Sequence, residues 1–323
     1  MDASKGNTTV VASHFRSPLT MATLRQSLDQ LSQHWHGMSE SLSQLLHEFD
    51  AVVTRSGQQV RDRRREERSG RRTGDEPGAE ASGAEEALVA RVNAGERAAV
   101  VLALPHGESA KTWLALKAQL GKDAERVFVL DLAADFRLKD PARHAATYGH
   151  AHASPEELAR FVYGLPELSQ QELAGATRVA APGCFATALQ LAALPAAEAG
   201  LLEGDSTWVF SGITGSSGSG NEPKPGTHHP HRHGNLWAYS LGGHRHEAEL
   251  LQALEPLGLA PALAFVAHSG PFARGIHLHA ALPLGNLVET AAVRALYTER
   301  FAGAPFVEVL QAGTPDLRSV AGS

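Results

Sequence analysis

The chain has 323 residues, 43% of them hydrophobic, which is enough to build the cores of two domains. Its formal net charge is −6, so no overall basic field attracts it to nucleic acid, and we expect no nucleic-acid partner. A single cysteine excludes an internal disulfide framework, no stretch approaches the roughly 18 consecutive apolar residues of a membrane helix, and the start of the chain shows no secretion signal. These features favour a cytoplasmic protein.

The first part of the chain predicts a short strand at 8–12 and then one long helix. Apolar residues between 24 and 52 recur at alternating spacings of four and three, which gives a heptad-like stripe. Such a helix either packs on a sheet or binds a partner as a coiled coil. The composition does not decide between these two interpretations.

A charged segment follows at 58–87. Arginines and glutamates dominate 61–72, and the acidic stretch after them is rich in glycine and alanine without any apolar period. This composition cannot bury enough apolar surface to fold, so we predict a solvated, disordered linker. A basic arm that binds RNA is the alternative.

From residue 98 the pattern becomes regular. Apolar runs at 98–104 and 127–132 flank a helix-like segment at 109–120, which indicates a βαβ unit with a buried parallel sheet. The later part predicts a sheet with helices on one face. Its expected strands are 208–211, 237–241, 262–268, 275–282 and 306–310, and its expected helices are 185–194, 247–257 and 288–301.

The only cysteine, Cys184, lies where an apolar strand meets a helix. Pro182 and Gly183 break the chain after the strand, and the helix predicted at 185–194 places Cys184 in its first turn. Unpaired N–H groups and the positive end of the helix dipole favour the nucleophilic thiolate there. A lone thiol can also be a small buried hydrophobic residue, but this junction favours a reactive cysteine.

Histidines gather in two motifs downstream of this cysteine. His244 and His246 follow a predicted strand, so one of them can face a cleft while the other packs inside. A Cys/His pair far apart in sequence is the usual way in which thiol catalysis is assembled. The other group, at 228–233, predicts a solvated or substrate-facing loop or, alternatively, a zinc site. Because HExxH and CxxC spacings are absent, we expect no metal.

Six further motifs follow one another along the chain. They are Ala-Leu-Pro-His-Gly at 103–107, Asp-Leu-Ala-Ala-Asp-Phe-Arg-Leu-Lys-Asp at 131–140, Val-Tyr-Gly-Leu-Pro-Glu-Leu at 162–168, Ser-Gly at 211–212 with a glycine-rich loop to 220, Gly-His-Arg-His at 243–246 and Arg-Gly-Ile at 274–276. With Pro-Gly-Cys-Phe-Ala-Thr at 182–187, they resemble the N-acetyl-γ-glutamyl-phosphate reductase family of arginine biosynthesis. The resemblance covers about 98–323. His-His-Pro at 228–230 is also similar to the related aminoadipyl-phosphate reductase of lysine biosynthesis, so the substrate stays open.

The resemblance implies an α/β protein with two domains: a Rossmann-like dinucleotide domain, and an α+β catalytic domain of the semialdehyde dehydrogenase type that also forms a homo-oligomer, a dimer or tetramer. Placed on this chain, it predicts five segments. They are an altered N-terminal part of the dinucleotide domain at 1–57, the linker at 58–87, the rest of the dinucleotide domain at 88–183, the catalytic and oligomerisation domain at 184–312, and a shortened end at 313–323.

The resemblance also implies the reaction. NADPH-dependent reduction of N-acetyl-γ-glutamyl phosphate gives the semialdehyde and phosphate. In it the Cys184 thiolate forms a thioester, NADPH supplies hydride, and His244 protonates the oxyanion, with His246 as the alternative base. Backbone N–H groups at the cysteine turn are the expected oxyanion donors.

Binding residues are implied by the same motifs. The expected cofactor-binding residues are Ser211, Gly212, Gly215, Pro105 and His106. The expected substrate-binding residues, each of which can instead form a structural salt bridge, are Arg137 and Arg274.

Two departures weaken the expected cofactor site. The family has a glycine-rich turn that holds the cofactor pyrophosphate after its first strand, but this chain has no glycine between residues 12 and 24. Arg55 and Ser56 can hold an adenosine 2′-phosphate, or lie in an exposed turn. The family also continues beyond the equivalent of Ser323.

We therefore keep two alternatives: a catalytically impaired relative that binds a partner through its heptad-like helix, and a metal-binding or hydrolytic protein built on the histidine loop.

Overall fold

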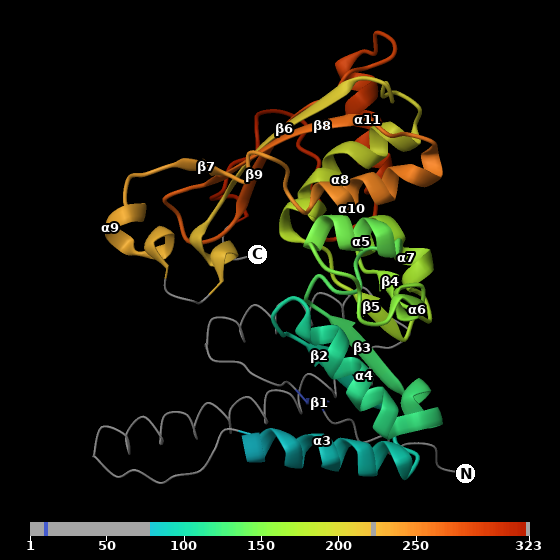
Figure 1. Cartoon of the computed structure of the whole chain (residues 1–323). Helices are drawn as coiled ribbons and strands as arrows, with labels where there is room; N and C mark the ends of the chain where they lie inside the picture. The colour runs from blue at the N-terminus through green and yellow to red at the C-terminus, as the bar shows by residue number, and fades with distance from the viewer. Residues whose placement is uncertain (1–9, 12–77, 221–223, 321–323) are drawn as a thin grey trace. The chain divides into compact units, whose positions relative to one another are not determined.

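The computed structural model describes residues 10–11, 78–220 and 224–320 (Figure 1). These residues belong to two compact units. Unit 1 is drawn from Met1–Phe136, His152–Gly164 and Glu172–Ala181, and unit 2 from Arg137–Ala151, Leu165–Gln171 and Pro182–Ser323. The helix expected at 24–52, the candidates Arg55 and Ser56, and the first part of the linker lie outside the described residues.

Unit 1 contains a five-stranded sheet in the order β1-β2-β3-β5-β4, in which every neighbouring pair is parallel. All five residues of β2 are buried, as expected of a central parallel strand. This arrangement confirms the Rossmann-like α/β prediction. The strands are β1 (Val10–Val11), β2 (Ala98–Leu102), β3 (Val127–Asp131), β4 (Val162–Tyr163) and β5 (Arg178–Ala180). The helices are α3 (Gly78–Asn93), α4 (Glu108–Leu120), α6 (Pro155–Leu158) and the 3-10 helix η1 (Gly121–Arg126).

Helix α3 begins inside the segment for which composition predicts a linker. Over 78–87 the chain is helical, because the apolar residues that follow give the helix a buried face. Leu88 and Val92, one turn apart, join the core around Trp113. Tertiary packing of these two side chains therefore extends the helix backward into a polar, glycine-containing sequence.

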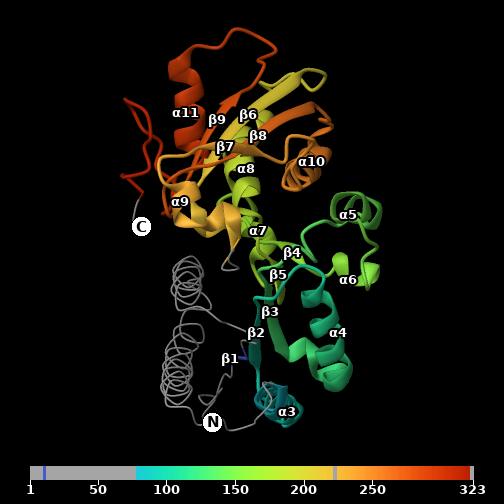
Figure 2. The same cartoon turned by 60° about the vertical axis from the view of Figure 1, so that its left-hand side comes forward.

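Unit 2 contains a four-stranded mixed sheet in the order β7-β8-β6-β9 (Figures 1 and 2). The central strands β6 (Thr207–Thr214) and β8 (Ala262–Ser269) are parallel. The edge strands β9 (Ile276–Ala281) and β7 (Trp237–Tyr239) are each antiparallel to their neighbour. Alternate residues of β6 are buried, so one face of this sheet is covered and the other is open.

Helices cover that buried face. Trp208, Phe210 and Phe265 from the strands pack with side chains of α8 (Cys184–Glu198) and α10 (Glu247–Leu254) in one core. This α+β arrangement confirms the prediction for the second domain. The other helices are α5 (Pro141–Tyr148), α7 (Pro166–Leu173), α9 (His229–Arg232), α11 (Thr290–Arg300) and the 3-10 helices η2 (Ser216–Ser219), η3 (Pro225–Thr227) and η4 (Glu255–Leu257).

The strand predicted at 306–310 is wrong. In this described segment the backbone pairs with no strand, and Phe306 remains 43% exposed. Its alternating apolar residues satisfy the pattern of a half-buried strand, but the segment pairs with none of the described strands. Separately, none of the described helices has the length and apolarity needed to cross a bilayer.

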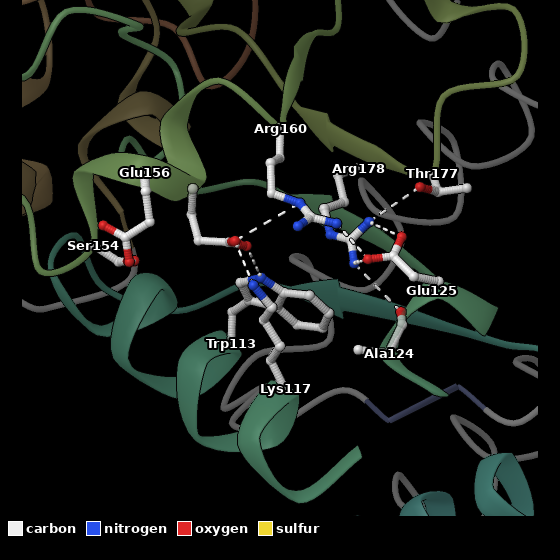
Figure 3. Close-up of polar contacts among 10 residues, drawn as sticks. Trp113, Lys117, Ala124, Glu125, Ser154, Glu156, Arg160, Thr177 and Arg178 are labelled. Atoms are coloured by element: carbon white, nitrogen blue, oxygen red, sulfur yellow. Dashed lines mark hydrogen bonds and ion pairs between the residues drawn. The ribbon is translucent and has the colours of Figure 1, made fainter. Parts of the chain in front are cut away.

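A network of charged side chains around Trp113 connects α4, α6 and β5 in unit 1 (Figure 3). The Glu157 side chain, on α6, is 1% exposed; it accepts a hydrogen bond from Trp113 Nε1 at 3.0 Å and pairs with Lys117. Arg178, the first residue of β5, lies over the Trp113 ring at 5.2 Å and pairs with Glu125 at 3.1 Å. The indole is thus fixed through both its N–H and its face.

We predict that Glu157→Ala lowers the free energy of unfolding by about 3–5 kcal/mol, because it leaves Lys117 and the Trp113 N–H without their buried acceptor. Urea unfolding followed by tryptophan fluorescence measures this change. The matched control is Glu156→Ala, which removes an exposed carboxylate beside it and should have a much smaller effect. Equal midpoints for the two variants would contradict the assignment.

Candidate active site

Cys184 is the first residue of α8, in unit 2. Gly183, at the N-cap, has an extended backbone with φ −69° and ψ 149°, and strand β5 ends three residues earlier, at Ala180. Cys184 reaches solvent, whereas the adjacent Phe185 is buried with its ring centroid 5.0 Å from that of Phe265. The predicted strand, turn and helix around the cysteine are therefore confirmed.

A buried carboxylate fixes the turn that precedes Cys184. Glu249, on α10 and 1% exposed, accepts a hydrogen bond from the Gly183 N–H at 3.0 Å through Oε2. Its other oxygen, Oε1, lies 3.4 Å from Nη1 of the buried Arg137. The negative charge of Glu249 is thus shared between one peptide N–H and one guanidinium.

The segment that carries Arg137 is bound to α10 a second time. Gln252 accepts from the Lys139 N–H at 2.6 Å and donates to the Arg137 carbonyl at 3.0 Å. Desolvation lowers the pKa of Lys139 to about 8. Arg137 was expected either to bind substrate or to form a structural salt bridge, and the structure shows the salt bridge.

The environment of Cys184 keeps its thiol protonated at rest. Protein atoms packed around the sulfur remove part of its hydration and raise its pKa, although the side chain still reaches solvent. The Phe185 N–H and the positive charges of Arg137 and Arg245 oppose this shift without reversing it. Only the thiolate form of a cysteine is nucleophilic, so a catalytic role for Cys184 would require a base.

His246 packs directly against the cysteine turn. It is the N-cap of α10 and is buried, and a Cβ atom placed on Gly183 would lie 2.4 Å from His246 Nε2. The glycine therefore permits an imidazole to touch the backbone immediately before Cys184.

His244 lies next to His246, and a hydrogen bond to its Nδ1 holds its ring in one tautomer. Its Nδ1 accepts from the His246 N–H at 3.2 Å, and its ring meets Phe185 and Phe265 edge-on. Desolvation, together with the charge of Arg245, lowers the pKa of His244 to about 4. His244 is consequently neutral at pH 7 and is a poor proton donor.

The Ser-Gly motif within β6 places its two residues on opposite faces of the sheet. A Cβ on Gly212 would lie 2.4 Å from Phe185 Cε1, so Gly212 makes room for the residue beside Cys184. Ser211 has the opposite orientation and lies on the open face. Gly215 approaches the loop before β9, where a Cβ would lie 2.6 Å from the Ala273 carbonyl oxygen, and this places it beside Arg274.

Two of the recognised motifs meet within unit 1, at the ends of β2 and β3. Asp135 accepts from the Gly107 N–H at 2.7 Å and the Ala110 N–H at 3.0 Å, and His106 Nδ1 accepts from the Ala134 N–H at 3.0 Å. These hydrogen bonds connect the turn that contains Pro105 to the turn after β3. This edge of a parallel sheet is where α/β proteins bind ligands.

The histidine loop at 228–233 is anchored by a residue that sequence reasoning passed over. Arg232 is buried and donates to Ser269 Oγ at 2.9 Å and to the Gly226 carbonyl at 3.1 Å, with its guanidinium 5.2 Å from the Trp237 ring centroid. The four histidines around it are exposed. Among the described residues, no three His, Cys, Asp or Glu side chains lie together as metal ligands would.

The sequence of the chain is similar to those of several known proteins. Residues 184–323 match the protein family described as semialdehyde dehydrogenase, dimerisation domain. The chain is 41% identical over 197 residues to the N-acetyl-gamma-glutamyl-phosphate reductase of Nitrosomonas europaea, which covers 60% of this chain and 56% of that protein. Over 235 residues it is 38% identical to the Nitrosomonas eutropha reductase, with coverage of 72% and 66%. It is also 40% identical over 214 residues to the LysW-L-2-aminoadipate 6-phosphate reductase of Deinococcus radiodurans, with coverage of 66% and 58%.

Cys184 is thus the first residue of the part of the chain that matches the semialdehyde dehydrogenase class. Within that class, the chain belongs to the N-acetyl-gamma-glutamyl-phosphate reductase family. It spans between 56% and 66% of the length of the three relatives named above.

The contact at Gly183 can be tested by adding one methyl group. Gly183→Ala should displace the buried His246 ring and lower the free energy of unfolding by about 1–3 kcal/mol, the usual cost of overpacking. Urea unfolding measures the change. Gly242→Ala is the control, because nothing lies within 4 Å of its added Cβ and its φ is not positive. If both variants match the wild type, the contact does not constrain the turn.

The charge of Arg245 can be tested through the reactivity of the only thiol. Arg245→Ala should raise the pKa of Cys184 further and slow its alkylation by iodoacetamide at pH 7 by roughly 3- to 5-fold, since a charge at the edge of a site contributes on the order of 1 kcal/mol. Mass spectrometry follows the reaction without interference. Arg245→Lys should restore the rate, and an unchanged rate in the alanine variant would refute the interaction.

Proposed function

We propose that the chain reduces an acyl phosphate, N-acetyl-γ-glutamyl phosphate, to its semialdehyde with release of phosphate. One observation carries this proposal: an exposed cysteine at a helix start, on a turn held by Glu249 and packed against a buried histidine. A relative at 41% identity bears the corresponding name, which supports the substrate.

Cys184 is proposed as the nucleophile. Its thiolate attacks the acyl carbon, the bond from that carbon to the phosphate oxygen breaks, and a thioester and free phosphate result. The first N–H groups of α8 have no side-chain cap, and they are the proposed donors to the oxyanion of this step. The positive charges of Arg137 and Arg245 act on the thiolate and favour its formation.

His246 is proposed as the acid–base group, in preference to His244, which the sequence ranked first. Its imidazole touches the backbone of Gly183, the residue immediately before Cys184, and this contact supports the choice. It can accept the thiol proton, give a proton to the oxyanion of the reduced intermediate, and take it back as aldehyde and thiolate separate. His244, neutral and bound through Nδ1, orients the backbone of His246.

A nicotinamide cofactor fits the parallel sheet of unit 1. We propose that Pro105 and His106, on the turn bound to the segment after β3, contact its nicotinamide end. When bound, NADPH would supply the hydride that reduces the thioester. The pyrophosphate has no cradle on α4, because the Asp135 carboxylate already occupies the N–H groups of Gly107 and Ala110.

Arg274 is proposed as a substrate-anion contact. Its exposed guanidinium lies on the loop beside Gly215, which approaches the Arg274 N–H closely. We also infer that copies of the chain associate through unit 2, and the match of 184–323 to a dimerisation domain supports this. The aminoadipyl phosphate remains the second substrate candidate, favoured by the relative from Deinococcus radiodurans.

Cys184→Ser should fold normally and abolish phosphate-dependent oxidation of the semialdehyde, the reverse reaction, because a serine hydroxyl is not ionised at neutral pH. Formation of NADPH at 340 nm reports the rate, and phosphate-free buffer is the blank. A serine variant that kept most of the wild-type rate would exclude the cysteine mechanism.

A matched pair of variants distinguishes the catalytic roles of His246 and His244. His246→Asn should cut turnover by roughly two to four orders of magnitude, the usual value of general acid–base help, whereas His244→Asn should cost much less. The pH profile of turnover supplies a second readout, because loss of the acid–base group flattens it. The opposite ranking would assign the proton transfers to His244.

Binding of NADPH should be weak. Charge-assisted phosphate contacts are each worth about 1.5–3 kcal/mol, and the glycine turn that supplies them in the family is replaced here by residues with side chains. Fluorescence titration of NADPH into the protein measures the affinity. A micromolar dissociation constant would show that another loop replaces the turn, whereas undetectable binding would favour the partner-binding alternative.

A further inference from the structure

The turn that carries the cysteine and the Gly-His-Arg-His motif run past each other in opposite directions. Gly183 leaves room for the later histidine, since a Cβ there would lie 2.4 Å from His246 Nε2. Phe185 meets the earlier histidine, with its ring centroid 5.6 Å from that of His244. The residue before the cysteine thus contacts one histidine and the residue after it contacts the other. These two contacts place the cysteine opposite the arginine between the histidines, Arg245.

Cys184 and Arg245 are the solvent-facing members of these two segments. Both are exposed, whereas three of the four residues that flank them are buried. Burial raises the pKa of Cys184, and the charge of Arg245 opposes that rise, so the field of the guanidinium reaches the sulfur. Desolvation and the same charge lower the pKa of His244. An anion that approaches the thiol from solvent therefore enters the field of Arg245.

The carboxylates close to this arginine in the sequence are used elsewhere. Glu249 is paired with Arg137, and Glu247 accepts a hydrogen bond from the His244 N–H at 3.1 Å. Within the part of the chain that the structure describes, the ion pairs do not include Arg245. An exposed cation in front of the thiol is therefore available to an anion that the protein does not itself supply.

We propose that Arg245 binds the phosphoryl group of the acyl phosphate while Cys184 attacks its acyl carbon. The inference rests on the proposed reaction and assigns a residue to the charged part of its substrate. In an acyl phosphate a single oxygen bridges phosphorus and the acyl carbon, so a substrate placed for attack carries its phosphate beside the sulfur. The planar guanidinium can donate two N–H groups to two phosphate oxygens.

The same contact stabilises the leaving group. When the bond from the acyl carbon to the bridging oxygen breaks, phosphate departs with that electron pair, and Arg245 faces the negative charge that develops on it. The other two arginines considered for anions are placed differently. Arg137 is buried against Glu249, and Arg274 lies on another loop, beside Gly215. Assigning the phosphoryl group to Arg245 leaves Arg274 for the substrate carboxylate.

Protection of the thiol by inorganic phosphate tests this site without any turnover. Alkylation of Cys184 in the full chain by iodoacetamide is followed by mass spectrometry at constant ionic strength, and each variant is compared with itself, with and without phosphate. Phosphate beside the sulfur should slow the wild-type reaction in a saturable manner, because it blocks the approach and disfavours the thiolate. Arg245→Ala should raise the phosphate concentration for half protection by about 10- to 100-fold, since it removes charge-assisted hydrogen bonds.

Two further variants separate charge, geometry and position. Arg245→Lys keeps the charge but loses the paired N–H groups, so its half-protection concentration should rise by only about 3- to 10-fold. Arg294→Ala removes a cation from α11, which meets α8 at Ala192, roughly two turns beyond the cysteine, and should be protected like the wild type. Circular dichroism shows whether each variant keeps the fold.

Three results would each overturn the proposal. They are a wild type whose alkylation does not respond to phosphate, an Arg245→Ala variant that is protected as well as the wild type, and a loss of protection in Arg294→Ala. A chain that phosphate protects through Arg245, but that does not oxidise the semialdehyde, would retain this anion site and overturn only the proposed reaction.

Discussion

The carboxylate of Glu249 holds the whole cysteine site together. One buried anion binds the peptide N–H just before Cys184 and the guanidinium of Arg137, two groups distant from it in sequence. A buried charge is tolerated only when it is fully paired, so the turn, the arginine and helix α10 have to adopt their positions together. The electrostatics of the thiol follow from the same arrangement, because Arg137 is one of the two cations that oppose the rise in the pKa of Cys184.

Glycine at position 183 is the steric counterpart of that electrostatic constraint. Its backbone angles are available to any residue, so conformational freedom does not explain its presence. The explanation is contact: the missing side chain leaves room for the His246 ring. Gly212, on β6, leaves room in the same way for the Phe185 ring. Both glycines let a ring approach the backbone near Cys184, and neither acts as a flexible hinge.

Local patterns in the sequence were sufficient for most of the fold but not for the contacts of the site. Buried strands such as β2 and the helix that starts at Cys184 follow from apolar runs and from Pro182-Gly183, which act over a few residues. The partners of Glu249 and Asp135 lie far along the chain or on another turn, and no periodicity reports them. A signal for Glu249 did exist: it is an acidic residue three positions after His246, on the turn of α10 that carries buried Leu250. The segment 306–310 shows the opposite failure, in which a strand-like pattern forms no strand.

The raised pKa of the single thiol has a further consequence for the lifetime of the protein. Peroxide and other oxidants react with thiolates, and the chain has no second cysteine that could trap a sulfenic acid as a disulfide. Oxidation of Cys184 would thus continue toward irreversible acids unless an external thiol intervened. A thiol that stays protonated is oxidised slowly, so the desolvation that raises the pKa of Cys184 also protects the protein.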